Sequence, residues 1–249
     1  MTNNKILEDI SKIKEITIAH GKADMRNFVF LRSRLSWVRI QKSVEYLSRF
    51  IPVGSKVLEL GCGCGHTTAM LAAIRHDLTI IGTDIETSSA WDELSGFGCS
   101  FRASDAVGLP FDADEFDAVV SFGVLEHVDD PVKFIKEVNR CLKKDGYNII
   151  FNLPNQYAVS EFMARMLGMS HHNKLYSRPE AIKILKDNGF KVCTVKREHF
   201  IPAELHRLGN IIGEAANRIC PFLFGLDQLL CKTPLVFISQ NFRIVSRKL

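Results

Sequence analysis

The sequence contains one stretch that decides its fold: Val57-Leu58-Glu59-Leu60-Gly61-Cys62-Gly63-Cys64-Gly65. A strand-like run leads into three alternating glycines, and a helical pattern begins at His66. Glycine has no Cβ, so such a loop can turn tightly and bring its backbone close to a ligand. A dinucleotide fingerprint, G-x-G-x-x-G, fits less well, because its third glycine would fall at His66 and pyrophosphate binding gives no reason for Glu59. The stretch predicts a strand, a ligand-binding loop and a helix.

Apolar runs of strand length alternate with helical patterns along the rest of the chain. This alternation predicts βαβ units and a parallel sheet. We expect strands at residues 56–60, 78–82, 99–103, 116–122, 147–152, 190–195 and 236–245. We expect helices at residues 36–50, 66–75, 88–94, 131–142 and 178–188. The predicted fold is a doubly wound, Rossmann-like α/β sheet, mostly parallel with an antiparallel last strand and with helices on both faces.

Length and composition favour one domain, since 249 residues with 46% hydrophobic content can bury a single large core. Its expected parts are N-terminal helices (1–55), a cofactor-binding core (56–153) and a substrate-side region (154–249). Seven cysteines without a disulfide-like spacing, and no apolar leader in residues 1–20, predict a cytoplasmic protein. A net charge of only +4 argues against a nucleic-acid partner.

An acidic residue closes the second predicted strand. Asp84 ends the run Ile80-Ile81-Gly82-Thr83-Asp84 and is followed by Ile85. Open α/β sheets bind ligands at the carboxyl ends of their strands, and a carboxylate there can accept both hydroxyls of a ribose. The alternative is that Asp84 only caps the next helix. We expect Asp84 and Ile85 to contact a cofactor.

These motifs resemble those of class I S-adenosylmethionine-dependent methyltransferases, and the fourth-strand motif resembles that of the ubiquinone and menaquinone biosynthesis methyltransferase group. The fourth-strand motif reads Ser121-Phe122-Gly123-Val124-Leu125-Glu126-His127-Val128, and Ser104-Asp105-Ala106 follows the third strand. The resemblance spans residues 56–130. It implies S-adenosylmethionine as cofactor, with Asp105 accepting from the adenine amino group. It assigns to the cofactor site Glu59, Gly61, Cys62, Gly63, Gly65, Asp84, Ile85, Ser104, Asp105, Ala106, Ser121 and Phe122.

Two histidines are candidates for catalysis. His127 lies near the end of the fourth-strand motif, where imidazole could serve as a general base or only make structural hydrogen bonds. His172, beside His171, falls in a loop expected to face the substrate, although a histidine pair is often simply a surface feature. Cys62 and Cys64 lack a second Cys/His pair, so no metal is predicted.

The region after the core carries an apolar segment at residues 202–234 with helical periodicity. It is interpreted as a lid or interfacial helix for a lipid-like or lipid-linked acceptor at a membrane surface, with Arg207, Arg218 and Lys232 facing headgroups. The other interpretation is a helical pair that completes the core or forms a homodimer contact. The chain is therefore expected to methylate a small-molecule acceptor. A catalytically silent S-adenosylmethionine-binding scaffold and an NAD-dependent oxidoreductase are the alternatives.

Overall fold

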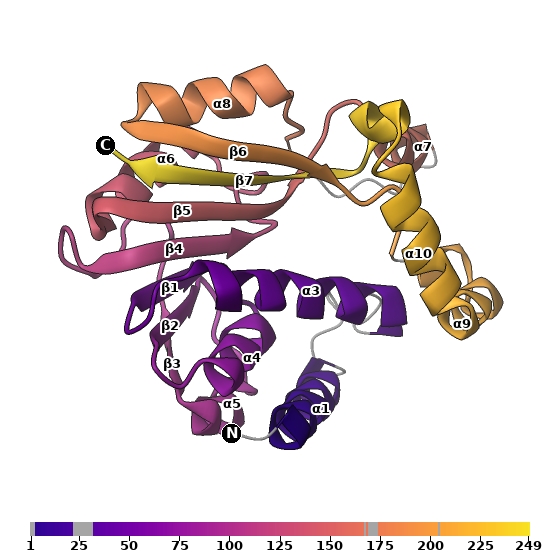
Figure 1. Ribbon diagram of the computed structural model, residues 1–249, viewed down its shortest axis with the longest axis horizontal. Coiled ribbons are helices and arrows are strands. Elements are labelled where there is room, and N and C mark those ends of the chain that lie inside the picture. Colours follow the sequence, from indigo (N-terminus) through magenta and orange to yellow (C-terminus); the bar gives the residue numbers. More distant parts are fainter. Residues whose placement is uncertain (1–2, 22–31, 167, 169–173, 204) are drawn as a thin grey trace. The chain divides into compact units, whose positions relative to one another are not determined.

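The computed structural model describes residues 3–21, 32–166, 168, 174–203 and 205–249 (Figure 1). The chain forms two compact units, one of residues 1–106 and 203–220 and the other of residues 107–202 and 221–249. Each unit contains strands and helices of its own. Within the described ranges, no helix has both the length and the apolar character that crossing a membrane requires.

The first unit contains three parallel strands in the order β3-β2-β1. They are β1 (Lys56–Leu60), β2 (Thr79–Asp84) and β3 (Cys99–Ala103). In register, Leu60 lies beside Thr83 and Asp84 beside Ala103, so the carboxyl ends of the strands meet at one edge. The helices are α1 (Asn3–Gly21), α3 (Arg34–Phe50), α4 (His66–Ile74), α5 (Trp91–Leu94) and α9 (Asn210–Arg218), with short 3-10 helices at Ser95–Phe97 and Leu205–Leu208.

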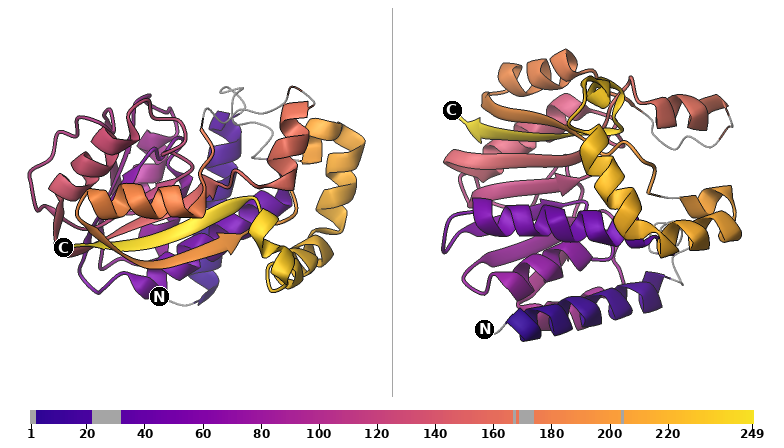
Figure 2. Two further views of the ribbon diagram at one scale, coloured as in Figure 1. Left: turned by 90° about the horizontal axis from the view of Figure 1, so that it is seen from above. Right: turned by 45° about the vertical axis from the view of Figure 1, so that its right-hand side comes forward.

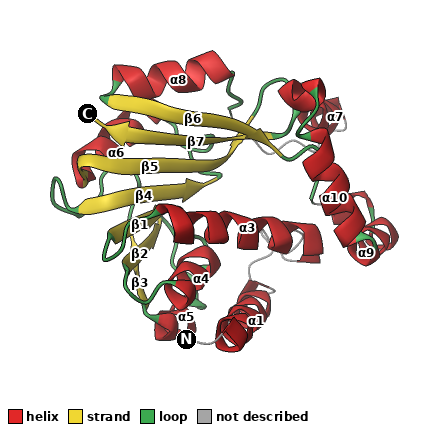
Figure 3. Ribbon diagram, viewed as in Figure 1, coloured by secondary structure: helices red, strands yellow, loops and turns green. Residues whose placement is uncertain are grey.

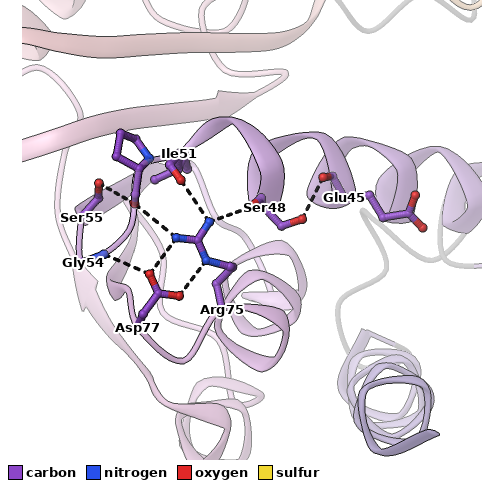
Figure 4. Close-up of polar contacts among 8 residues, drawn as sticks. Glu45, Ser48, Ile51, Gly54, Ser55, Arg75 and Asp77 are labelled. Atoms are coloured by element: carbon purple, nitrogen blue, oxygen red, sulfur yellow. Dashed lines mark hydrogen bonds and ion pairs between the residues drawn. The ribbon is translucent and has the colours of Figure 1, made fainter. Parts of the chain in front are cut away.

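The first unit places α4 against the strands and α1 and α3 against α4. Nearly every residue of α4 is buried, which explains why its sequence has no polar face. At its end, Arg75 donates to the carbonyl oxygens of Ile51 and Pro52 at 3.0 and 3.2 Å and forms a two-point ion pair with Asp77, at 2.7 Å for each bond (Figure 4). Asp77 also accepts from the Gly54 amide at 3.0 Å. This network fixes the turn from which β1 begins.

The second unit contains four strands in the order β4-β5-β7-β6. They are β4 (Phe116–Phe122), β5 (Leu142–Pro154), β6 (Phe190–Glu198) and β7 (Asn241–Lys248). β4 and β5 are parallel, and β7 is antiparallel to both of its neighbours (Figure 3). The helices are α6 (Pro131–Cys141), α7 (Val159–Met166), α8 (Arg178–Asp187) and α10 (Cys220–Leu230), with a 3-10 helix at Pro234–Ile238. α6 packs on β5 and α8 on β6.

The structure confirms a mostly parallel sheet with an antiparallel last strand and corrects several boundaries. Residues 236–238, predicted as strand, lie in the 3-10 helix that begins at Pro234, because proline fixes a helical φ there and Ser239 donates its amide to Val236 at 3.1 Å. Strand β5 extends beyond 147–152, and β2 runs from Thr79 to Asp84, so that Asp84 closes the second strand as predicted. Helix α5 starts at Trp91 rather than Ser88, whose hydroxyl accepts from the Ala90 amide.

Candidate cofactor site and its surroundings

The glycine loop has the backbone geometry that its sequence predicts. Gly61, Gly63 and Gly65 have φ angles of 67°, 53° and 88°, a region that residues with a Cβ rarely adopt. The Cys62 amide donates to the Thr83 carbonyl at 2.9 Å, and the Gly65 amide donates to the Cys62 carbonyl at 2.8 Å. A Cβ added at Gly63 would meet no atom within 4 Å. The loop is therefore a tight turn with open space at its tip.

Glu59 organises this loop from beneath. Its side chain is 5% exposed, and its two oxygens accept hydrogen bonds from the hydroxyls of Thr67 and Thr68 in the first turn of α4. Burial raises the pKa of Glu59 to about 7, although the two hydroxyl donors act in the opposite direction. The carboxyl group therefore joins β1 to the start of α4 and orients the loop between them.

Asp84 lies at the edge of the loop. One carboxylate oxygen accepts from the Gly63 amide at 2.7 Å, and the other accepts from the Glu86 amide at 3.3 Å. Asp84 therefore bonds the turn that follows it and does not cap helix α5, which begins at Trp91. Since each carboxylate oxygen has more than one acceptor site, Asp84 retains capacity to bind two hydroxyl groups of a ligand beside the loop.

The remaining predicted residues of the first unit lie around Asp84. The Ser104 amide donates to the Asp84 carbonyl at 2.8 Å, which places the turn after β3 next to the end of β2. Asp105 is exposed and Ala106 is half-buried. Ile85 is 71% exposed, and its contact with a cofactor stays a prediction.

Sequence reasoning missed two aromatic residues that hold the loop. The Trp91 indole nitrogen donates to the Gly63 carbonyl at 2.8 Å, and its ring stacks on Phe101 at 5.4 Å and 11°. A Cβ on Gly65 would lie only 2.5 Å from the Phe101 ring, too close for any side chain. Gly65 is therefore required by packing as well as by its φ angle.

In the second unit, Ser121 and Phe122 end strand β4. Ser121 is 2% exposed, while Phe122 is half-buried and stacks on Phe151 of β5 at 4.6 Å and 10°. Gly123 follows with a φ of 64° and turns the chain out of the sheet. Phe122 therefore packs on a neighbouring strand. Its contact with a cofactor stays a prediction.

Of the two histidines predicted as catalytic, the structure describes only His127. The side chain of His127 is 48% exposed, and its Nε2 lies 4.0 Å from Oε1 of Glu126. His172 lies outside the described residues. Glu126, in the same turn, is only 2% exposed, which the sequence alone does not predict.

The cysteines of the loop are buried. Cys62 and Cys64 are 3% and 6% exposed, and burial raises the pKa of the Cys62 thiol far above its usual value. Within the described residues, no cluster of three or more His, Cys, Asp or Glu side chains could hold a metal ion. The loop therefore offers backbone groups, rather than thiolates, to a ligand.

Comparison with known proteins agrees with this geometry. A methyltransferase bound to the Haloferax volcanii Trm112 methyltransferase activator has a TM-score of 0.62 at 18% identity, over 94% of this chain and 97% of that one. A SAM-dependent methyltransferase from Methanosarcina mazei has a TM-score of 0.59 at 19% identity, over 82% and 97%. Residues 58–150 match the family model described as "Methyltransferase domain". Residues 58–150 are thus similar to a methyltransferase domain, and the solved structures share the fold of the chain.

Curated relatives of the chain share a printed name, "Ubiquinone biosynthesis O-methyltransferase". The protein from Xanthomonas axonopodis pv. citri is 30% identical over 149 residues, which are 55% of this chain and 62% of that protein. The protein from Bartonella bacilliformis is 29% identical over 153 residues, 56% and 61% of the two chains. The match thus spans about three-fifths of the length of these relatives.

Proposed function

We propose that the chain transfers a methyl group from S-adenosylmethionine to a hydroxyl oxygen of a small acceptor that carries an apolar chain. The proposal that S-adenosylmethionine is the cofactor rests mainly on the hydrogen bond from the Gly63 amide to the Asp84 carboxylate at 2.7 Å. It joins the tip of a glycine loop to an acidic strand end inside the matched methyltransferase domain. When bound, S-adenosylmethionine supplies a methyl group on a positively charged sulfur.

The residues of the first unit fit this cofactor. The space above Gly63 admits a ligand against the backbone, and Asp84 has the acceptor capacity to bind a ribose. Asp105 lies one strand further, where we expect it to accept from the adenine amino group. Trp91 bonds the loop directly and Glu59 bonds the first turn of α4 that follows it, so both residues hold the loop in place. Positioning of this kind supplies much of the rate in a transfer between two bound molecules.

The choice of an oxygen acceptor rests on the relatives, whose names describe O-methylation in ubiquinone biosynthesis. The choice of an apolar acceptor rests on the second unit. Its described residues expose large apolar side chains on α7 and α10 and on the 3-10 helix at Pro234–Ile238. Exposed fractions are 65% for Phe162, 74% for Met166, 67% for Phe222, 61% for Leu229 and 51% for Phe237. A cluster of this kind is typical of a membrane or protein contact.

Exposed apolar side chains within the segment 202–234 support its interpretation as a lid or interfacial helix. Its α9 part, in the first unit, exposes 88% of Ile211, and its α10 part exposes Phe222 and Leu229. Figure 2 shows α10 beyond the ends of strands β6 and β7. Asp227 of α10 is fully buried and accepts from the amides of Phe200 and Ile201 at 2.6 and 2.8 Å, which anchors the helix while its apolar side chains face outward.

We infer that this surface rests on an anionic membrane. Lys232 after α10 and Arg165 on α7 are exposed beside the apolar residues, the combination that binds negatively charged lipid surfaces. The protein should sediment with phosphatidylglycerol vesicles at low salt and less so at high salt. Replacing Phe222 and Leu229 with Ser should abolish sedimentation, whereas replacing Val53, a more exposed apolar residue of the first unit, with Ser should not. Sedimentation unaffected by the double replacement, or a stable dimer in the analytical ultracentrifuge, would contradict this inference.

Turnover separates an enzyme from a silent cofactor-binding scaffold. The test is formation of S-adenosylhomocysteine from S-adenosylmethionine in the presence of 4-octylcatechol, an apolar molecule with two aromatic hydroxyls. We expect product that depends on the catechol and that forms more slowly in Asp84→Ala at limiting S-adenosylmethionine. Tight binding of S-adenosylhomocysteine without any such turnover would favour the scaffold.

A further inference from the structure

An ionisable side chain is buried beneath the glycine loop of the first unit. Glu59 of β1 is 5% exposed, and its two oxygens accept from the hydroxyls of Thr67 and Thr68. Both hydroxyls favour the ionised carboxylate, whereas burial disfavours it and raises the pKa of Glu59 to about 7. A change of charge close to the loop therefore alters the ionisation of this group at neutral pH.

The neighbouring strand makes room for this carboxyl group. In register, Gly82 of β2 lies beside Glu59. A Cβ added at Gly82 would lie 2.8 Å from the hydroxyl oxygen of Thr68, so the glycine allows this hydroxyl to reach Glu59. The next residue of β2, Thr83, donates its hydroxyl to the Glu59 carbonyl at 3.2 Å. These contacts hold the carboxyl group between β1 and the first turn of α4.

The charge around the loop is negative. One oxygen of Asp84 accepts from the Gly63 amide at the tip of the loop at 2.7 Å, and the Asp84 carboxylate acts on Glu59 in the direction that raises its pKa. Residues 57–106 contain seven acidic and two basic residues. A loop flanked by two carboxyl groups in an acidic segment favours a ligand that brings positive charge to its tip.

Other titratable groups buried near Glu59 are neutral at pH 7. Burial raises the pKa of the Cys62 and Cys99 thiols, both of which interact with Glu59, far above neutral pH. Burial also lowers the pKa of His66, which follows the loop, to about 4. Of these buried groups, Glu59 is the one whose charge changes near pH 7.

We propose that Glu59 is a specificity-determining residue that distinguishes the cofactor from its product. Its ionised carboxylate attracts the positively charged sulfur of S-adenosylmethionine, whereas S-adenosylhomocysteine has a neutral sulfur and gains no such attraction. Contact with the ligand is not required, because charges interact over several ångströms at the partly buried edge of a protein. The inference rests on the proposed function and adds to it a preference for cofactor over spent product.

Two other roles of Glu59 make different predictions. If Glu59 only joins β1 to α4, its ionisation does not affect which ligand binds. If it pairs with the amino group that both ligands carry, the two ligands respond to its ionisation alike. Binding of the two ligands at several pH values separates these three roles.

The test is calorimetric titration with S-adenosylmethionine and with S-adenosylhomocysteine between pH 5.5 and 7.5, where the amino groups of both ligands remain mostly protonated. The ratio of the Kd of S-adenosylhomocysteine to that of S-adenosylmethionine should rise roughly fivefold with pH in the wild type, since the charged ligand favours ionised Glu59. In Glu59→Gln the ratio should stay within twofold. Glu8→Gln, the same exchange at an exposed position of α1, should behave as wild type.

A second measurement counts protons at a single pH. Calorimetry at pH 6.5 in buffers of different ionisation enthalpy should show release of roughly half a proton when S-adenosylmethionine binds the wild type. We expect almost no release with S-adenosylhomocysteine, and almost none with either ligand in Glu59→Gln.

Thr68→Val replaces Glu59→Gln if that variant does not bind either ligand. Valine keeps the shape of threonine but removes one hydroxyl that favours the ionised carboxylate. The rise of the ratio should then move to higher pH than in the wild type, and a rise at the wild-type pH would contradict the role of Glu59.

Three results would overturn the assignment of Glu59. The first is a ratio in the wild type that does not change with pH, which leaves Glu59 as a structural link. The second is a rise that persists in Glu59→Gln, which attributes it to another group. The third is an equal response of both ligands, which identifies the shared amino group as the partner. Failure of the wild type to bind either ligand at any pH would instead contradict the proposed function itself.

Discussion

Replacement of Glu59 by Gln tests whether the structure describes the base of the glycine loop correctly. The Glu59 carboxyl group is 5% exposed and accepts from the hydroxyls of Thr67 and Thr68. Its pKa rises from 4.5 to about 7 on folding, so the folded protein favours the protonated form. The stabilisation from this preference is complete below pH 4.5 and is lost as the pH rises through 7. Glutamine resembles the protonated carboxyl group and does not titrate.

The size of the effect follows from the pKa change. Moving the pKa from 4.5 to about 7 corresponds to roughly 3 kcal/mol of unfolding free energy, lost between pH 4 and pH 8. Glu59→Gln should therefore gain stability relative to wild type by about that amount as the pH is raised from 4 to 8. Urea unfolding at a series of pH values measures the difference, with the exposed Glu8→Gln as control. A difference that stays constant with pH, or that changes in the opposite direction, would refute the reasoning.

Further predictions concern the loop and the turn that precedes it. Asp84→Ala should weaken binding of S-adenosylhomocysteine by roughly 1–3 kcal/mol in calorimetry, the cost of losing a charged hydrogen-bond partner, whereas the exposed Asp92→Ala should bind normally. Unchanged affinity would place the ribose elsewhere. Arg75→Ala removes the ion pair and carbonyl bonds of Figure 4 and should lower the melting temperature by roughly 4–8 °C, with Arg49→Ala near wild type. Gly65→Ala should unfold at lower urea concentration than wild type, since its Cβ would lie 2.5 Å from an aromatic ring; an unchanged midpoint would contradict the packing described.

Much of the fold could be predicted from the sequence because its strands are short apolar runs bounded by turn residues. Strands β1, β3 and β4 occupy the predicted residues, and the antiparallel last strand was expected. The glycine loop and Asp84 were also predicted, since their roles depend on local geometry at a strand end. Residues 236–238 were assigned wrongly because their apolar side chains fit a strand pattern as well as a short turn after Pro234.

The rest of the site depends on contacts between distant residues. The Trp91 indole donates to the Gly63 carbonyl, 28 positions away in the sequence. The Tyr176 hydroxyl donates to the Leu125 carbonyl, 51 positions away. Glu126 is only 2% exposed, and no local sequence pattern marks its carboxyl group as buried. The exposure of α10 could not be predicted either, because helical periodicity does not show whether an apolar face packs against another element.

The central claim is that the first unit binds S-adenosylmethionine, and side-by-side calorimetric titration with S-adenosylhomocysteine and NAD tests it most directly. We predict saturable binding of S-adenosylhomocysteine that is weakened by Asp84→Ala, and no measurable binding of NAD. Binding of NAD without any heat from S-adenosylhomocysteine would contradict the account and identify the glycine loop as a dinucleotide site.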